Sequence, residues 1–109
     1  MNSFHQLFQL GQQVQARMTE IQTELASKTI EASSGGGLVR VTADGQGRIR
    51  QVKIDPSVVN ASDVEMLEDL VQAAVSEAQG RARKLYEEEV GRVAGGLGPL
   101  NLGNLFGGS

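Results

Sequence analysis

The sequence predicts an α+β fold in which a small three-stranded antiparallel sheet lies between two long helices. Apolar residues recur at helical spacing towards each end of the chain, and short alternating segments separated by glycine turns lie between them. The helices are too long for a chain of 109 residues to bury fully. We therefore expect them to project as arms and to need a partner chain.

The first helix is predicted over residues 7 to 25. Its apolar stripe repeats every 11 residues, a period that keeps the stripe nearly parallel to the axis and predicts a straight arm. The stripe advances in steps of three and four and consists of Leu7, Leu10, Val14, Met18, Ile21 and Leu25.

Two alternating segments predict the first two strands. Residues 29–33 tolerate extended structure, and the glycines at 35–37 supply a turn or bulge after them. In residues 38–44, Val39 and Val41 alternate with polar neighbours, so their side chains share one face of the strand.

The third strand is predicted at residues 48–54, after a hairpin at Asp44-Gly45, because glycine accepts the positive φ that tight hairpins need. Its apolar residues change phase midway, and a bulge near Arg50-Gln51 would reconcile the two halves. Asp55-Pro56 ends the strand, since proline has no N–H to donate.

The second helix is predicted to start at Ser62, because Ser62 to Glu65 has the S-x-x-E form of a capping box. It could run to about Ala94, which makes residues 1–94 one domain. Residues 95–109 are rich in glycine, and we expect a flexible tail there. A docking segment is the alternative, because the tail holds five large apolar residues. The helix stripe consists of Leu67, Val71, Ala74, Ala78, Ala82 and Leu85.

The composition argues against an enzyme. The chain has no cysteine and only one histidine, His5, so no thiolate nucleophile or cysteine zinc site exists and His5 has no second ligand to share a metal. Gly45 and Gly47 lie between strands and do not open a helix, unlike a dinucleotide loop. Glu87 to Glu89 are consecutive on a helix, so their carboxylates point apart and cannot converge on one substrate atom. We expect no cofactor and no small-molecule substrate.

The chain is also not expected to enter a membrane or to be exported. It has neither a signal-peptide pattern at its start nor a run of about 18 apolar residues. The absence of cysteine fits a reducing cytosol. A net charge of −3 argues against polyanion binding through overall charge, so such binding would need a local basic face.

Basic residues are the remaining candidates for a site. Arg81, Arg83 and Lys84 lie within one helical turn, and Arg92 extends them along the helix. Such a surface could neutralise phosphates, and the lack of interleaved aromatic residues favours duplex backbone over single strands. A second group belongs to the two central strands and could neutralise phosphates in the same way; it consists of Arg40, Arg48, Arg50 and Lys53.

Ion pairs within the helix are the alternative interpretation of its cations. Acids lie three or four residues away from several of them. The possible pairs are Arg81 with Glu77, Lys84 with Glu87 or Glu88, and Arg92 with Glu88.

Three motifs, in this order, resemble the YbaB/EbfC nucleoid-associated family. They are Gly37-Leu38-Val39-Arg40-Val41-Thr42, Val52-Lys53-Ile54-Asp55-Pro56-Ser57, and Glu65-Met66-Leu67-Glu68-Asp69-Leu70-Val71 followed by Ala73-Ala74 and Ala78. The glutamine-rich first helix is similar as well, and the resemblance covers about residues 4 to 94.

The resemblance implies a small bacterial protein of the cytoplasm and nucleoid, a tweezer-shaped homodimer that binds duplex DNA and alters its conformation. With contacts mainly to phosphates, we expect low sequence specificity. The expected contact residues are Arg81, Arg83, Lys84 and Arg92, with Arg17 and Lys28 second. The alternative function is a protein-interaction or holdase module, because long helical arms also resemble prefoldin-like architecture.

Overall fold

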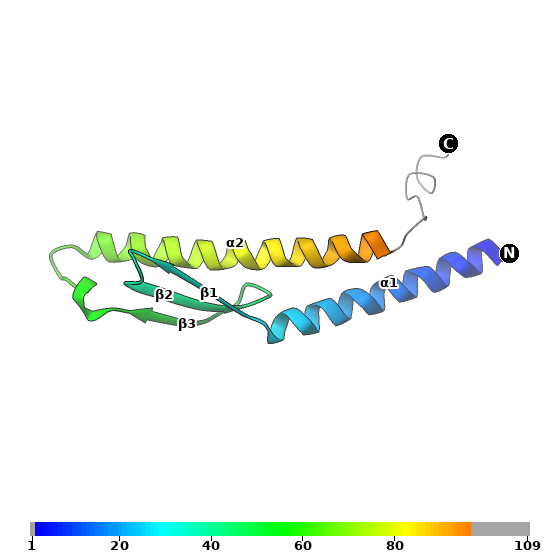
Figure 1. The fold of residues 1–109 in the computed structure, drawn as a ribbon, viewed down its shortest axis with the longest axis horizontal. Helices are drawn as coiled ribbons and strands as arrows, with labels where there is room; N and C mark the ends of the chain where they lie inside the picture. The colour runs from blue at the N-terminus through cyan, green and yellow to red at the C-terminus, as the bar shows by residue number, and fades with distance from the viewer. Residues whose placement is uncertain (1, 97–109) are drawn as a thin grey trace, which may run out of the picture.

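The computed structural model describes residues 2–96 and confirms the predicted α+β order of helix, three strands and helix. The molecule is elongated, with extents of 71 × 27 × 17 Å. Figure 1 shows the second helix lying along the sheet while the first helix projects beyond the end of the sheet. The elements are α1 (Asn2–Ser27), β1 (Thr29–Ser34), β2 (Val39–Asp44), β3 (Ile49–Ile54), the short 3-10 helix η1 (Pro56–Val58) and α2 (Val64–Gly96).

The helices are longer than predicted, because α1 continues beyond both ends of its apolar stripe and α2 continues past Ala94. Gly95 and Gly96, which the sequence assigned to a tail, belong to α2. The remainder of that predicted tail, residues 97–109, lies outside the described residues.

The sheet has the order β1-β2-β3 with both pairs antiparallel. The predicted bulge is confirmed. Thr42 pairs with Gln51 and the next residue, Ala43, pairs with Ile49, so Arg50 is the extra residue on β3. The bulge returns the apolar residues of both halves of β3 to the same face of the sheet.

The glycines of the two turns have different roles. All three glycines at positions 35–37 adopt positive φ, as the turn between β1 and β2 requires. The prediction of positive φ at Gly45 was wrong, and in that hairpin Gly47 has φ +86° instead. Gly45 is needed for space, because a Cβ atom there would lie 2.5 Å from the carbonyl oxygen of Leu25.

The core lies between α2 and one face of the sheet. Ala74 and Ala78 of α2 are fully buried against Val39 and Val41 of β2. Small side chains on the helix allow its backbone to approach the sheet closely. The edge strand β1 is fastened to α2, since the hydroxyl of Ser34 donates to the carbonyl oxygen of Leu70 at 2.6 Å.

Only the C-terminal part of α1 is buried. Ile21 and Leu25 have almost no exposed surface where α1 meets α2 and the β2–β3 hairpin. The backbone N–H of Gly45 donates to the carbonyl oxygen of Leu25 at 2.7 Å and fixes the hairpin to this helix end. At the other end Phe4 is 75% exposed and Phe8 is 58% exposed, so α1 projects as an arm.

The start of α2 differs from the predicted capping box. Asp63, not Ser62, is the N-cap, because its carboxylate accepts the N–H of Met66 at 3.2 Å. Ser62 is engaged elsewhere, since both its N–H and its hydroxyl donate to the Oδ1 of Asn60, at 3.0 and 2.7 Å. With Ser62 engaged by the Asx turn at Asn60, the N-cap lies one residue further along the chain than predicted, and the helix begins at Val64.

Candidate nucleic-acid interface

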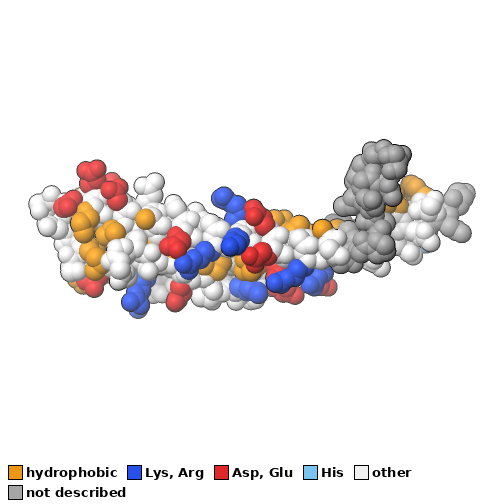
Figure 2. All heavy atoms as spheres, turned by 45° about the horizontal axis from the view of Figure 1, so that its top comes forward, with side chains coloured by type: hydrophobic (Ala, Val, Ile, Leu, Met, Phe, Trp, Pro, Cys, Tyr) orange, Lys and Arg blue, Asp and Glu red, His pale blue; other side chains and the backbone are white. Residues whose placement is uncertain are grey.

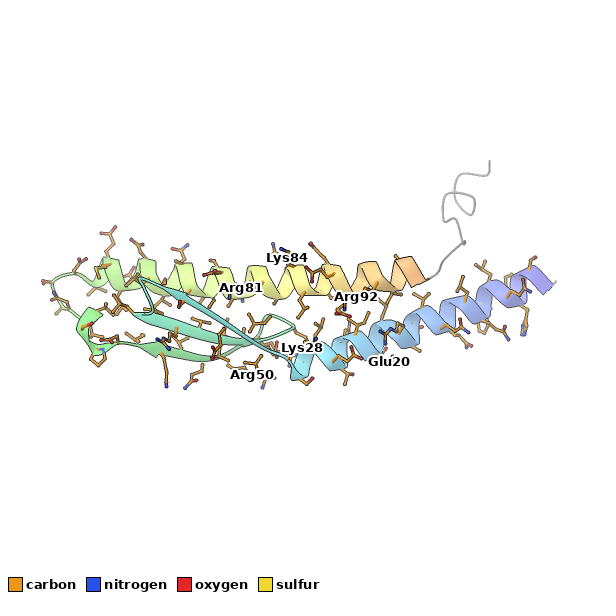
Figure 3. All side chains as sticks on the ribbon, in the orientation of Figure 1. Glu20, Lys28, Arg50, Arg81, Lys84 and Arg92 are labelled. Carbon is orange, nitrogen blue, oxygen red and sulfur yellow. The ribbon has the colours of Figure 1, made fainter. Side chains whose placement is uncertain are left out.

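Arg81, the first of the predicted contact residues, connects α2 to the sheet. Its Nη1 donates to the carbonyl oxygen of Glu31 in β1 at 2.6 Å, and its Nη2 donates to the carboxylate of Glu77 at 2.7 Å. Figure 3 shows the side chain on the side of α2 that faces the strands. The alternative pairing of Arg81 with Glu77 is therefore confirmed, and the guanidinium already has two protein partners.

Arg92 and Arg17 also have acid partners. Arg92 donates to Glu89, whose side chain is almost completely buried, and not to Glu88 as the sequence suggested. Arg17 pairs with Glu20 at 2.8 Å and lies 4.0 Å from Glu24. The hydrogen bond to Glu20 raises the pKa of Arg17, and burial lowers it by less. The negative charges of Glu20, Glu24 and Glu89 also raise this pKa.

Arg83, Lys84 and Lys28 are exposed and form no ion pair within residues 2–96. Arg83 and Lys84 do not share a face, since consecutive helical residues point about 100° apart. Lys84 points away from the sheet, whereas Lys28 lies at the junction of α1 and β1 (Figure 3). The structure therefore separates side chains that the sequence grouped within one helical turn.

Arg83 shares a hollow with Arg48, a residue that the sequence did not place among the contact residues. The hollow has a volume of about 710 Å³ and lies where α1, the β2–β3 hairpin and α2 meet. Gln46, Gln79 and Tyr86 add polar side chains to its lining. Two arginines from distant segments thus line one concave surface. Proximity in the sequence gave no sign of this, since the two residues are 35 positions apart.

Arg50 has a structural role in the hairpin. It donates to the Oδ2 of Asp44 at 3.0 Å, while the Oδ1 of Asp44 accepts the backbone N–H groups of Gln46 at 2.9 Å and Arg48 at 3.0 Å. Burial raises the pKa of Asp44, but these three hydrogen bonds and the charge of Arg50 outweigh it, and the pKa lies below its ordinary value. The ionised carboxylate therefore holds the hairpin closed at neutral pH.

Arg40 and Lys53 lie on the face of the sheet turned away from α2. They are direct partners in the β2–β3 ladder, both are exposed, and neither forms an ion pair within residues 2–96. The sequence identified both as part of a strand group but gave no reason to prefer them. Their juxtaposition depends on the register of the two strands, which the bulge at Arg50 shifts.

Charge is unevenly distributed along the described chain. Residues 29–54, which form the sheet and its turns, carry four cations and two acids, although the whole chain has a net charge of −3. Residues 55–80 carry six acids and no cation. Figure 2 shows acidic side chains gathered at the N-terminal end of α2, and cations mixed with acids further along the molecule. The acidic N-terminal end of α2 would therefore repel a polyanion, whereas the cations of residues 29–54 would attract it.

Other kinds of site have little support in residues 2–96. Within that part of the chain no three histidine, cysteine or acidic side chains gather in a way that could hold a metal ion. None of the helices that the structure describes is long and apolar enough to span a membrane.

Comparisons with known proteins identify the family. A protein from Acetivibrio thermocellus named nucleoid-associated protein is 44% identical over 98 residues, covering 90% of this chain and 87% of the relative. One of the same name from Mycolicibacterium vanbaalenii is 45% identical over 92 residues, covering 84% of each chain.

A crystal structure of an uncharacterized Helicobacter pylori protein has the same fold. Its TM-score is 0.67 at 23% identity, over 86% of this chain and 95% of that one. The family model described as the YbaB/EbfC DNA-binding family matches residues 1–97, which include all of the described residues. The chain therefore belongs to the YbaB/EbfC DNA-binding family.

Proposed function

We propose that this protein binds the backbone of duplex DNA as a homodimer, with low sequence specificity, and alters the conformation of the DNA. The observation that carries the proposal is the family match over residues 1–97. The names of the relatives, nucleoid-associated protein, support action on the nucleoid in the cytoplasm and give no indication of catalysis. Cations that have no acid partner in residues 2–96 supply the charge that phosphate contacts need.

The six contact residues expected from the sequence divide into two groups. Arg83, Lys84 and Lys28 can take a phosphate without giving up a protein partner. Arg81, Arg92 and Arg17 would have to exchange a carboxylate for a phosphate, so we assign them a smaller share of the binding energy. Contacts of this kind carry no sequence information, and discrimination would come from the shape and bendability of the duplex.

The apolar side of β3 supports the homodimer. Ile49, Val52 and Ile54 lie on the same face of the sheet as the buried Val39 and Val41, yet they are 37%, 41% and 39% exposed. The cause is that α2 covers β1 and β2 but not β3. A second copy of this chain is the occupant we propose, because the exposed strip continues the apolar core directly and symmetric association of identical surfaces is common.

Salt-dependent binding tests the DNA proposal. Labelled duplexes of two unrelated sequences and equal length are titrated with protein at several salt concentrations, and fluorescence anisotropy reports binding. Release of counterions makes the logarithm of the association constant fall linearly with the logarithm of the salt concentration. The magnitude of this salt slope is about 0.9 for each phosphate neutralised, and we expect similar slopes for both duplexes because phosphate contacts do not depend on sequence. Absence of binding at about 50 mM salt, a concentration at which such contacts are strong, contradicts the proposal.

A protein-interaction or holdase role is the second candidate, and the exposed tip of α1 is the observation that favours it. Phe4, Leu7 and Phe8 expose large apolar side chains at the end of the arm. The test is light scattering from a chemically denatured protein diluted into buffer with and without this chain. Suppressed aggregation by a protein that fails to bind either duplex supports the holdase role, and unaltered aggregation removes it.

A further inference from the structure

We propose that the outer face of the sheet, the face turned away from α2, is a separate phosphate-contacting surface for duplex DNA. The inference rests on the proposed function and adds a binding surface to it. The face is defined by the outward residues of the three strands. They are Glu31 and Ser33 of β1, Arg40 and Thr42 of β2, and Gln51 and Lys53 of β3.

The outward direction of these side chains follows from the pleat. Successive residues of a strand point to opposite sides, so the neighbours of the buried Val39 and Val41 point away from α2. No helix among the described residues packs on this side. Figure 1 shows α2 along one side of the sheet and the other side open. Arg40 and Lys53 are exposed accordingly.

The strongest indication of a ligand is the placement of two like charges directly opposite each other. Arg40 and Lys53 are partners in the ladder, which brings their Cβ atoms to about 5 Å, and like charges so placed destabilise a sheet. Within residues 2–96 no acid pairs with either. Arg40 makes only a long hydrogen bond from its Nε to the carbonyl oxygen of Gly37, at 3.4 Å. A phosphate between the two cations would turn this repulsion into attraction.

The surroundings of the pair suit a nucleic-acid backbone. Ser33, Thr42 and Gln51 lie beside the two cations and are side chains of the kind that donate to phosphate oxygens. A hollow of about 560 Å³ includes these residues in its lining, and Glu77 and Arg81 of α2, which are paired with each other, line it as well. No aromatic side chain lines the hollow, so stacking of unpaired bases is not provided for and duplex backbone is the better fit.

Glu31 is the one acid of the face and makes an independent test possible. It pairs with Thr42 and therefore lies diagonal to Arg40. Its backbone oxygen accepts from Arg81, but its exposed side chain forms no ion pair in the described chain. A phosphate bound between Arg40 and Lys53 would be repelled by this carboxylate.

The first experiment compares two double variants with equal loss of charge. R40Q/K53Q removes the cations of the outer face, and R83Q/K84Q removes two cations of α2. We expect R40Q/K53Q to reduce the magnitude of the salt slope by about 1.8 for each protomer that contacts the duplex, because two phosphates are lost. The affinity should fall at least tenfold at about 100 mM salt. Thermal stability should stay the same or rise, since a like-charge pair has been removed.

The opposite change gives the opposite expectation. Glu31→Gln should raise the affinity for the duplex severalfold while its stability stays near that of the natural protein. If R40Q/K53Q and Glu31→Gln both keep the natural affinity and salt slope, the outer face does not contact DNA and the inference is overturned. If the natural protein itself fails to bind the duplex, both the proposed function and this inference fail. Binding by the natural protein that neither substitution changes overturns the inference alone.

The three lysines of the chain allow a direct footprint on the natural protein. Lys28 lies at the α1–β1 junction, Lys53 on the outer face and Lys84 on α2, so acetylation of each amine followed by mass spectrometry samples three separate surfaces. We expect saturating duplex to slow acetylation of Lys53 at least threefold. Protection of Lys84 alone, with Lys53 acetylated at its free rate, would overturn the inference and leave the proposed function standing.

Discussion

At Gly45 the chain has no room for a side chain, whereas at Gly80 it has room to spare. A Cβ atom at Gly45 would lie 2.5 Å from the carbonyl oxygen of Leu25 and 3.0 Å from its Cα, and both are backbone atoms that cannot turn aside. Gly80, in the exposed middle of α2, has nothing within 4 Å of such an atom. Two glycines with ordinary φ thus differ completely in the packing around them.

Alanine substitutions should separate these two glycines. We expect Gly45→Ala to lower the free energy of unfolding by roughly 2 to 3 kcal/mol, because the backbone must shift to relieve the overlap. Gly80→Ala should raise it by about 1 kcal/mol through better helix propensity. Urea unfolding at one fixed protein concentration measures both. A loss of stability in Gly80→Ala would indicate that a partner chain packs closely there.

The carboxylate of Asp44 should make stability depend on pH in the acid range. Its pKa is lowered in the folded protein, so its contribution is fully present above the unfolded value, near 3.8, and is lost as pH falls through the folded pKa. We expect Asp44→Asn to unfold at lower urea than the natural protein at pH 7, with the difference shrinking below pH 3.8. An equal difference at pH 7 and pH 2.5 would contradict this.

At the scale of the elements, periodicity predicted what the structure contains because apolar residues recur on one face of each helix and strand. The bulge in β3 was predictable for the same reason, since Ile49 and Val52 must both face the apolar side. The helix start was not, because Ser62 and Asp63 are both possible N-caps, and only the local geometry, in which Ser62 donates to Asn60, decides between them. The role of Gly45 depends on Leu25, 20 residues earlier, which no local pattern reveals.

Arg81 joins two elements, and its substitution should affect stability more than that of its neighbour Lys84. Arg81→Gln removes the hydrogen bonds to the Glu31 carbonyl and to Glu77, and we expect a loss of about 1 kcal/mol in the free energy of unfolding. Lys84→Gln removes no protein contact in the described chain and should change stability by less than about 0.5 kcal/mol. In DNA titrations Lys84→Gln should cost at least as much affinity as Arg81→Gln. The reverse order in both measurements would contradict these roles.

At the scale of the whole molecule, a single copy leaves too much apolar surface open beside its core. If the apolar side of β3 is covered by a second copy, Val52→Asp should place a charge in that interface and shift the protein to monomers of 11.6 kDa in analytical ultracentrifugation. Gln51→Asp is the matched control, because it adds the same charge one residue away on the opposite face. A dimer that survives Val52→Asp would place the interface elsewhere.

The candidate site was less predictable than the fold. The sequence could identify which residues are cations, but their availability depends on partners such as Glu31, which lies 50 residues from Arg81. The pairing of Arg40 with Lys53 depends on strand register, and the hollow that Arg48 and Arg83 both line depends on how the hairpin packs against α2. Long-range geometry of this kind is not contained in local spacing.

The uneven placement of charge gives the molecule an electric dipole moment, and this has a consequence for DNA that the protein covers. Cations predominate in residues 29–54 and acids in residues 55–80. The electric field of a protomer would favour approach of a duplex to the sheet and disfavour its approach to the start of α2. Duplex coated in this way would present an outer layer of carboxylates. Neighbouring coated segments would then repel one another much as bare DNA does.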